Sequence, residues 1–500
     1  MGGTMGDENT VLTPAEARHL LRRTGFGAPA DEVQRLLTKY GTRGRAADFL
    51  LGFKLASFRP GGRDLDDRQK SWLVYMLKTK SPLQEKLVLF WHDHFATNNT
   101  TVGNSKRMAN QNGLLRQHCK GNFKTFVNAI NLDAAMMVFL DTVRNQKFQP
   151  NENYPRELLE LFTLGVLDSN GSPNYAQEDI VQIARAFSGW RVDDRDQPFL
   201  NEGQHDYSED YPERGPKVIF QTYGGFGSAG RSFAGAGEGE PEIAAVIDVL
   251  FDHRDSDGKK TIARRVARRL LEYFAHGAFS VPSPATTAVV DDVVAESGFD
   301  QTWELRPLLR AIFTSDAFFE TSSPAPDGPS TIRSVKWPVD YAVTAMRTLG
   351  IKPSGKDGRI DGGSRRRLIE HLVNMGQEVF EPPSVFGWDW ENSWLTSRTF
   401  LARATFARDL TVARGNGGTH FRPERLVDLT LTDPAAIVDE VAGLLGVADR
   451  IGPEEHDVFV DYLTNEGTRS SLDLQDEEIR ESKLAGLFAL ILQSPAFQLH

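Results

Sequence analysis

The sequence predicts an all-α fold, a large multi-helix array with one long irregular Gly-rich loop region in the middle. Apolar residues recur at helical spacing through most of the chain, and helix-start signals precede several of these segments. Between residues 193 and 240 the helical spacing fails and glycines accumulate. The length of 500 residues allows two or three domains or one extended array. We expect a helical region at 1–192 that holds the candidate site, an irregular region at 193–240 and a helical region at 241–500, together forming one integrated unit.

Regularly spaced apolar residues in the first half predict a series of helices. The first begins with Thr13 as N-cap and Pro14 at the first helical position, and Glu16 follows three residues after the cap. Polar, turn-rich segments at 58–68 and 96–108 predict loops. The predicted helices are 13–21, one starting at residue 31, 45–51, 72–80, 83–95, 109–118, 123–131, 134–140, 151–165 and 180–187.

The second half returns to helical spacing. Its predicted helices are 241–251, 260–274, 285–296, 303–313, 337–349, 365–375, 397–416, 434–445, 454–463 and 478–491. The basic run KKTIARRVARR at 259–269 is interleaved with Ile262 and Val266, which indicates the solvated face of a packed helix, with an anion site as the alternative. The loop GQEVFEPPSVFGWDWENSW at 376–394 either caps the core or lines a substrate cleft.

Composition limits the classes of function. A formal net charge of −11 argues against nucleic acid as the main partner, because no excess of Lys and Arg is available for a phosphate backbone. The single Cys119 excludes an internal disulfide and a thiolate metal cluster, and we expect it to be a packing residue. No apolar stretch approaches the roughly eighteen residues of a membrane span, and no signal peptide is visible. We expect a soluble protein, cytoplasmic as the sequence stands, or exported if a signal was removed.

The segment LQEKLVLFWHDHF at 83–95 combines an apolar helix with side chains that can bind metal. Glu85 and His92 share a face, since seven residues are close to two helical turns. His94 lies roughly 200° around the helix from His92, so the two imidazoles converge only if the helix ends or distorts between them. The alternative is a pair of buried histidines that are hydrogen-bonded to backbone or carboxylate groups.

Carboxylates also stand within the predicted helix NENYPRELLELFTLG at 151–165. Glu157 and Glu160 are three residues apart and therefore neighbours on an otherwise apolar helix, where they need a metal, arginines or raised pKa values. Arg156, four residues before Glu160, could form a structural ion pair with it. Asp179 begins a later helix, where its charge favours the helix dipole. His205 and Asp206 stand alone in the irregular region.

Seven motifs follow one another along nearly the whole chain: HLLRRTGFGA, EKLVLFWHDHF, NENYPRELLELFTLGV, YAQEDIVQIARAFSGW, His205 and Asp206 with Lys217, MGQEVFEPPSVFGW, and SPAFQ. In this combination the chain resembles a bacterial family known only as a domain of unknown function, numbered 1800. The resemblance implies one predominantly helical unit. It also implies a partner of the alkaline-phosphatase-like class, because members are often exported and often encoded beside such proteins. This sequence differs in showing no export signal and a longer Gly-rich stretch after His205.

Carboxylates and imidazoles on facing helices are the arrangement of two-metal carboxylate sites, although the usual Glu-x-x-His pair is missing here. We therefore predict a metal-dependent enzyme, a hydrolase or an oxidase, with a divalent Zn, Mn or Fe cofactor. The predicted metal ligands are His92, His94, Glu157 and His205, the predicted catalytic residues are Glu160, Asp206 and Arg156, and Glu85, Asn153 and Asp179 have secondary roles.

Two alternatives belong to other classes of function. The first is a non-catalytic helical scaffold or accessory protein, in which the same polar residues form a buried network that fixes the helix arrangement. The second is a haem protein with His92 or His94 as the axial ligand, although the sequence contains no haem attachment motif. The sequence determines neither the substrate nor the oligomeric state.

Overall fold

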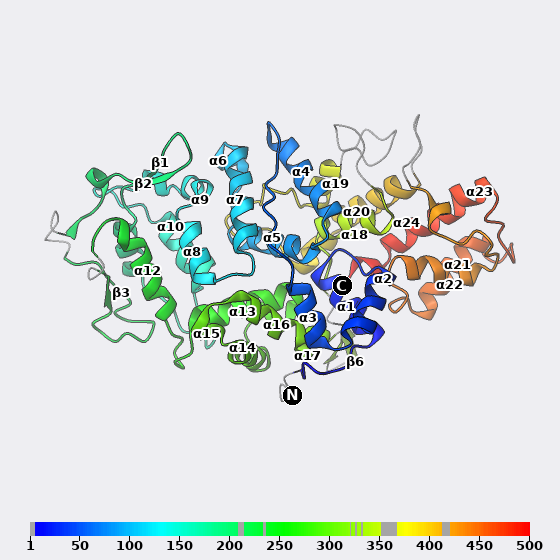
Figure 1. The fold of residues 1–500 in the computed structure, drawn as a ribbon, viewed down its shortest axis with the longest axis horizontal. Coiled ribbons are helices and arrows are strands. Elements are labelled where there is room, and N and C mark those ends of the chain that lie inside the picture. Colours follow the sequence, from blue (N-terminus) through cyan, green and yellow to red (C-terminus); the bar gives the residue numbers. More distant parts are fainter. Residues whose placement is uncertain are drawn as a thin grey trace.

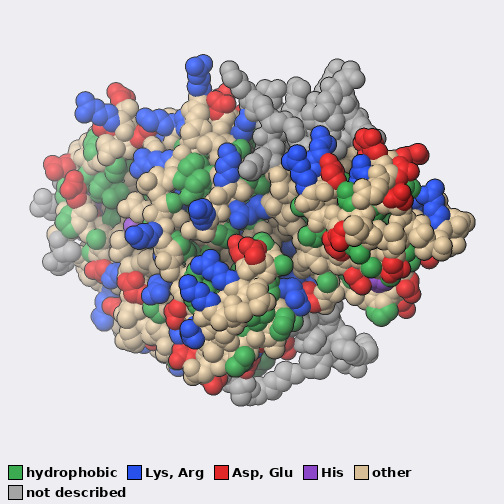
Figure 2. Space-filling view, turned by 45° about the vertical axis from the view of Figure 1, so that its right-hand side comes forward, with side chains coloured by type: hydrophobic (Ala, Val, Ile, Leu, Met, Phe, Trp, Pro, Cys, Tyr) green, Lys and Arg blue, Asp and Glu red, His purple; other side chains and the backbone are tan. Residues whose placement is uncertain are grey.

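The computed structural model describes residues 6–208, 215–233, 237–320, 322–325, 328–331, 334–351, 368–412 and 421–500. Helices form most of it, and its strands form small two-stranded antiparallel sheets, so the fold is all-α as predicted. Figure 1 shows an array of helices that is longest in one direction, with the first helices beside helices from the middle of the chain. Charged side chains of both signs lie side by side on the face drawn in Figure 2.

The first half of the chain forms helices close to the predicted ones. The helix α1 begins with the predicted capping box, in which Thr13 accepts from the Glu16 amide and the Glu16 carboxylate accepts from the Thr13 amide at 2.9 Å. The helical elements are α1 (Pro14–Thr24), α2 (Ala30–Arg35), η1 (Leu36–Tyr40), α3 (Arg43–Leu51), α4 (Leu65–Lys78), α5 (Pro82–His94), α6 (Asn99–Val102), α7 (Ser105–His118), α8 (Phe123–Asn131), α9 (Ala134–Phe139), η2 (Thr142–Arg144), α10 (Asn153–Glu157), η3 (Leu158–Thr163) and α11 (Gln177–Ala186).

Side-chain caps explain where the predicted loops were wrong. Asp64 caps α4 by accepting from the Asp67 amide, so this helix begins inside the segment predicted as a loop at 58–68. In the predicted loop 96–108, Asn98 caps α6 and Asn104 caps α7. The polar residues of these segments thus start helices, because their side-chain oxygens satisfy free backbone amides at the first turn.

The helix α5 lies at the centre of the array. Pro82 occupies its first turn, and every side chain from Leu83 to His94 is buried. It packs against α1 and α7. Because no face of α5 reaches solvent, its charged and imidazole groups must find partners within the protein.

The irregular region at 193–240 is the least regular part of the described chain. The strand β1 (Trp190–Val192) pairs with β2 (Pro198–Leu200), and β3 (Val218–Ile219) pairs with β4 (Arg231–Ser232). The short helix η4 (Glu202–Gln204) follows β2 and ends at His205. Residues 209–214 and 234–236 of this region, the latter in the Gly-rich tract, lie outside the described residues.

The second half is again helical. Its elements are α12 (Glu240–Asp252), α13 (Thr261–Phe274), η8 (Gly277–Ser280), α14 (Pro284–Ser297), α15 (Phe299–Thr302), α16 (Leu305–Thr314), α17 (Asp316–Phe319), β5 (Ser322–Ala325) paired with β6 (Gly328–Thr331), α18 (Pro338–Thr348), α19 (Leu368–Met375), η9 (Glu391–Leu395), α20 (Ser397–Thr411), η10 (Pro423–Arg425), α21 (Pro434–Leu444), α22 (Pro453–Thr464), α23 (Glu477–Ile479), η11 (Arg480–Leu484), α24 (Ala485–Gln493) and α25 (Pro495–Gln498). Residues 365–367 and 413–416 of two predicted helices lie outside the described part.

Contacts between distant segments join the two halves. The helix α1 packs on α17, and α3 packs on α16. His19 on α1 bonds the Phe318 carbonyl at 2.8 Å, and Arg23 donates to the Phe274 carbonyl at 2.6 Å. One buried hydrophobic cluster therefore extends through both halves. Among the described residues, no helix has both the length and the apolar character needed to cross a membrane.

Candidate functional site

His92 and His94 point to different neighbours because α5 stays helical through both residues. His92 Nε2 accepts a hydrogen bond from the Phe380 amide at 3.1 Å, and burial lowers the His92 pKa to about 3. His94 Nε2 lies 3.1 Å from the Phe162 carbonyl oxygen, which can only accept, so His94 donates there. Burial and the nearby Arg269 hold the His94 pKa well below its usual range. Both rings are therefore neutral at pH 7.

The carboxylate of Glu85, which is also on α5, has protein partners for both of its oxygens. Its carboxylate forms a bidentate ion pair with Arg116, at 2.9 and 2.7 Å, and accepts from the Trp72 indole at 2.7 Å. The Glu85 and Arg116 side chains are fully buried. The geometry is that of a structural ion pair inside the core.

The polar residues of α10 and η3 lie nearer the surface. Arg156 pairs with Glu152 at 2.9 Å and lies 3.7 Å from Glu160, so the predicted ion pair is present. Glu157 is half-buried, and burial together with Glu160 raises its pKa. Its Oε2 atom is buried and has no hydrogen-bond partner in the described part of the chain. Asn153 is exposed. Glu157, the predicted metal ligand of this segment, thus has one carboxylate oxygen that is buried and unsatisfied by the described residues.

Asp179 has the helix-starting role expected from sequence. Its Oδ2 accepts from the Ala176 amide at 2.7 Å, and its Oδ1 accepts from the Phe220 amide at 2.6 Å. The carboxylate therefore caps α11 and also holds the chain beside β3.

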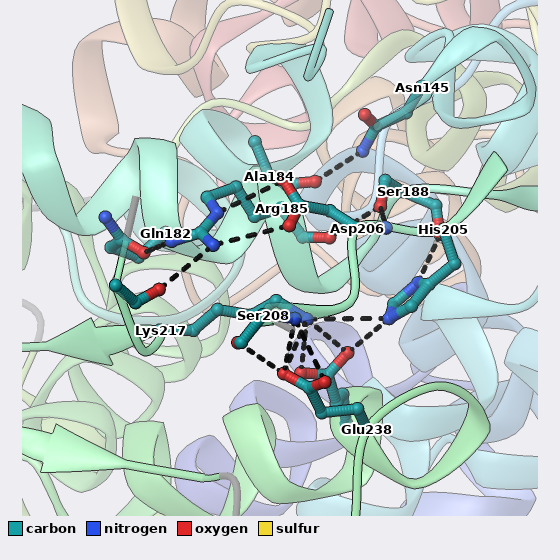
Figure 3. Close-up of polar contacts among 12 residues, drawn as sticks. Asn145, Gln182, Ala184, Arg185, Ser188, His205, Asp206, Ser208, Lys217 and Glu238 are labelled. Carbon is teal, nitrogen blue, oxygen red and sulfur yellow. Dashed lines mark hydrogen bonds and ion pairs between the residues drawn. The ribbon is translucent and has the colours of Figure 1, made fainter. Parts of the chain in front are cut away.

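His205 lies in a buried charged cluster that we call the His205 cluster: His205, Lys217, Glu238 and Glu242. Figure 3 shows the Lys217 ammonium between the His205 ring and Glu238. Lys217 Nζ lies 2.7 and 2.9 Å from the Glu242 oxygens, and His205 Nε2 lies 2.7 Å from Glu242 Oε2. The other ring nitrogen, Nδ1, donates to the Ser188 carbonyl at 2.8 Å. The side-chain nitrogens of His205 and Lys217 therefore all contact polar groups of the protein.

Asp206 faces away from this cluster. It accepts from Arg185 on α11, with Nε to Oδ2 at 3.2 Å and NH2 to Oδ1 at 3.3 Å. Figure 3 shows the Arg185 and Asp206 pair above Lys217. His205 and Asp206 are thus adjacent in sequence but belong to two separate ion-pair groups.

A cavity of about 740 Å³ opens beside α5 and is lined by two adjacent residues of that helix, Asp93 and His94. We call it the arginine cavity, because α13 contributes Arg265, Arg268 and Arg269 to its wall. The turn after η3, at 164–171, and the loop residues Val385 and Phe386 complete the lining, together with Asp168, Asp255 and Glu272. The cavity therefore joins the predicted histidine helix, the basic run and the aromatic loop.

Asp93 is the buried carboxyl group of this cavity. Its Oδ1 accepts from the Trp388 amide at 2.8 Å, and its Oδ2 accepts from the Trp390 indole at 3.1 Å. Arg269 NH2 lies 3.4 Å from Oδ2. Burial nevertheless raises the Asp93 pKa to about 7. The group can therefore both accept and release a proton near neutral pH.

The backbone of the loop at Gly387 lies close against the Asp93 carboxylate. Gly387 has φ of 83°, and a Cβ built there would lie 2.3 Å from Asp93 Oδ1. A side chain at this position would displace the carboxylate or the loop. The loop 376–394 caps the core, since Trp388 and Trp394 are buried with Trp337, and Phe386 lines the cavity. Its predicted role in a substrate cleft stays a prediction.

The carboxylates of the cavity have protein partners, whereas two of its arginines have no carboxylate partner. Glu272 pairs with Arg269 at 2.9 Å, Asp255 pairs with Arg264 at 2.9 Å, and Asp168 accepts from the Ser256 amide at 2.8 Å. Arg265 donates to the carbonyls of Glu160 and Leu161, and Arg268 donates to Thr286 and Thr287. Within the described ranges, no carboxylate forms an ion pair with Arg265 or Arg268. Burial lowers the Arg265 pKa only to about 10, so it stays charged at pH 7.

Residues 19–499 match the protein family described as Protein of unknown function (DUF1800). The chain belongs to this family. No curated protein and no solved structure matches the chain. The family assignment confirms the resemblance inferred from the motifs.

Sequence reasoning missed Asp93 in this DUF1800 chain, and the basic run forms the packed helix α13 as expected. The run 259–269 is not only a solvated face, because three of its arginines line the cavity. A signal was present: Asp93 stands between the two histidines that drew attention to α5. The partners that make Asp93 distinctive, Trp388 and Trp390, are far away in sequence and carried no local signal.

The predicted metal ligands do not form one group in the described part of this DUF1800 protein. No set of three or more His, Cys, Asp or Glu side chains there is placed to hold a metal ion. His94 lines the arginine cavity, His92 faces Phe380, and His205 faces Glu242. The metal site with His92, His94, Glu157 and His205 stays a prediction. Cys119 is buried, and burial raises its pKa to about 12, which fits its expected packing role.

Proposed function

We propose that this protein is an acid–base enzyme, a hydrolase, that binds an anionic substrate in the arginine cavity. The observation that carries the proposal is that Arg265 and Arg268, which have no ion pair with a carboxylate in the described part of the chain, line the same cavity of about 740 Å³ as Asp93, whose buried carboxyl group lies behind the wall. Arginine presents a rigid fork of donors that suits phosphate, sulfate and carboxylate groups. A cavity of this size suits a small organic molecule.

Arg265 and Arg268 would bind the anionic group, and Asp93 would transfer the proton. As the water oxygen attacks the ester centre, Asp93 accepts a proton from the water. The bond to the leaving oxygen then breaks, and the proton passes from Asp93 to that oxygen. Ester and water thus give acid and alcohol with no change of oxidation state. The raised pKa of Asp93 suits both halves of this transfer near neutral pH.

Anion binding is the first test of this function. Calorimetry with inorganic phosphate and sulfate, at constant ionic strength, should detect saturable binding to the wild type. Arg268→Gln should weaken it about tenfold, because a hydrogen bond to a charged group contributes roughly 1.5–3 kcal/mol. The control is Arg398→Gln, which changes an exposed arginine on the helix α20 and should leave binding unchanged. Equal affinity in all three proteins would contradict the proposed anion site.

Turnover of 4-nitrophenyl phosphate and 4-nitrophenyl sulfate tests the catalytic part. Asp93→Asn keeps the size of the side chain and removes the exchangeable proton, so kcat should fall by about 10²–10⁴-fold while anions still bind. The neutral ester 4-nitrophenyl acetate serves as a comparison substrate and should be turned over poorly. Full activity in a folded Asp93→Asn protein would remove Asp93 from the mechanism.

A non-catalytic scaffold is the second candidate, and the closed polar groups favour it. The His205 cluster and the Glu85 and Arg116 pair are buried and satisfied by protein partners, as expected for networks that fix helix positions. Under this alternative, neither phosphate nor sulfate should bind the arginine cavity, and Asp93→Asn should change only stability.

The metal-dependent and haem alternatives can be tested directly. Elemental analysis with an absorption spectrum of protein purified without chelator would show a transition metal or a haem with His92 or His94 as ligand. The alkaline-phosphatase-like partner implied by the family resemblance also stays a proposal, as does the cellular location. A partner that releases phosphate from esters would act on the substrate class proposed here, and co-purification would test the pairing.

A further inference from the structure

Large apolar side chains are exposed at the mouth of the arginine cavity. Phe386 is 69% exposed, Val166 is 55% exposed and Leu167 is 54% exposed, and all three line the cavity. Val281, which is 68% exposed, lies between the lining residues Ser280 and Pro282. Single exposed hydrophobic residues are ordinary on a protein surface, but several around one cavity indicate a surface that a ligand covers.

The apolar rim is continuous with the charged wall. Leu161 lines the cavity, and its carbonyl accepts from Arg265 at 3.2 Å. At the other side, Phe386 stands two residues before Trp388, whose amide holds Asp93. A molecule whose anionic group reaches the arginines therefore lies against apolar side chains where it leaves the cavity.

We propose that the substrate is an anionic amphiphile, with its charged group on Arg265 and Arg268 and its apolar body against Phe386, Val166 and Leu167. This inference rests on the proposed function and names the substrate class of the same site. Desolvation of the body at the rim would add affinity to the charge interaction in the cavity.

Hexyl phosphate, below its micelle concentration, is the probe that separates the two contributions. By calorimetry it should bind the full-length wild type at least about tenfold more tightly than inorganic phosphate. Phe386→Ser should remove most of this advantage and leave the affinity for inorganic phosphate unchanged. The matched control is Phe148→Ser, because Phe148 is 67% exposed and does not line the cavity. Hexyltrimethylammonium, with the same chain and the opposite charge, should show no saturable binding.

Each outcome decides between the inference and the function on which it rests. Equal affinity for hexyl phosphate and inorganic phosphate, both weakened by Arg268→Gln, would overturn the amphiphile and keep the anion site. An unchanged hexyl phosphate affinity in Phe386→Ser would also overturn it. Failure of both phosphates to bind would overturn both proposals. Sedimentation with vesicles that contain phosphatidylglycerol, if lost in Phe386→Ser, would assign the same chemistry to a lipid headgroup.

Discussion

The His205 cluster and the arginine cavity are two charged regions that differ in how their positively charged side chains are paired. In the His205 cluster the side chains of His205, Lys217 and Glu242 are at most 2% exposed, and both Lys217 and the His205 ring contact the Glu242 carboxylate. In the arginine cavity Arg265 and Arg268 donate to carbonyl and hydroxyl groups, and neither forms an ion pair with a carboxylate in the described part of the chain. Both regions hold charges away from bulk water, and under the proposed function only the arginine cavity would use its charge to bind a ligand.

This difference separates structural from functional charge. A buried cation with a full set of partners fixes the positions of its elements and has little left to bind. A partly buried cation without a counter-charge is costly for the folded protein, and a bound anion would offset that cost. Variants that change one region at a time, with stability and anion binding measured for each, test whether the two regions differ in this way.

The largest effect on stability should come from Lys217→Met. The change leaves Glu242 buried without its cation, which costs about 3–5 kcal/mol of unfolding free energy. Urea denaturation measures the loss, and anion binding by the remaining folded protein should be unchanged. The control is Lys124→Met, whose ion pair with Asp248 is largely exposed and contributes at most about 1 kcal/mol. Equal losses of unfolding free energy in the two variants would show that the buried Lys217 pair contributes no more to stability than the more exposed Lys124 pair.

The pH dependence of stability should isolate Asp93. Burial raises its pKa from 3.8 to about 7, so the folded protein keeps a proton that the unfolded chain releases. This contribution is fully present below about pH 4, falls as the pH rises, and is constant above about pH 7. The unfolding free energy of the wild type, minus that of Asp93→Asn, should decrease by up to about 4 kcal/mol across this range. A difference independent of pH would rule out a raised Asp93 pKa.

A smaller loss is expected for His92→Ala, which leaves the Phe380 amide without its acceptor. The unsatisfied donor should cost about 1–3 kcal/mol. The same variant tests the predicted metal site, because metal content should fall if His92 is a ligand. His456→Ala on the surface of α22 serves as the control for both measurements. Wild-type metal content in both His92→Ala and His205→Ala would falsify the predicted ligand set.

The smallest effect should come from Arg156→Ala. Its side chain is 37% exposed and its partners lie one helical turn before and after it. Such pairs contribute about 0.3–0.5 kcal/mol each. Thermal denaturation at low and high salt measures the change, which should shrink as salt screens the pairs. A loss of activity without a loss of stability would instead support the catalytic role predicted for Arg156.

Local signals predicted most of the helices, and distant contacts account for most of what was missed. The capping box of α1 and the ends of α8 follow from neighbouring residues, so the sequence alone indicated them. The caps at Asn98 and Asn104 were also local, but the polar run around them is typical of loops. His205 was identified as a candidate, whereas its partner Glu242 was not, because packing rather than sequence spacing brings them together. The same holds for Asp93 and Trp388.

The contact between the loop and Asp93 places the groups that hold the carboxylate next to a side chain that lines the cavity. The carboxylate is held by the Trp388 amide and by the absence of a side chain at Gly387, whereas the adjacent Phe386 presents its ring to the rim. Under the proposed function, the Trp388 amide, the Trp390 indole and Arg269 would set the reactivity of Asp93, and the side chain of Phe386 would set ligand preference. Replacement of residue 386 could therefore redirect the protein to another molecule while the proton-transfer group stays in place.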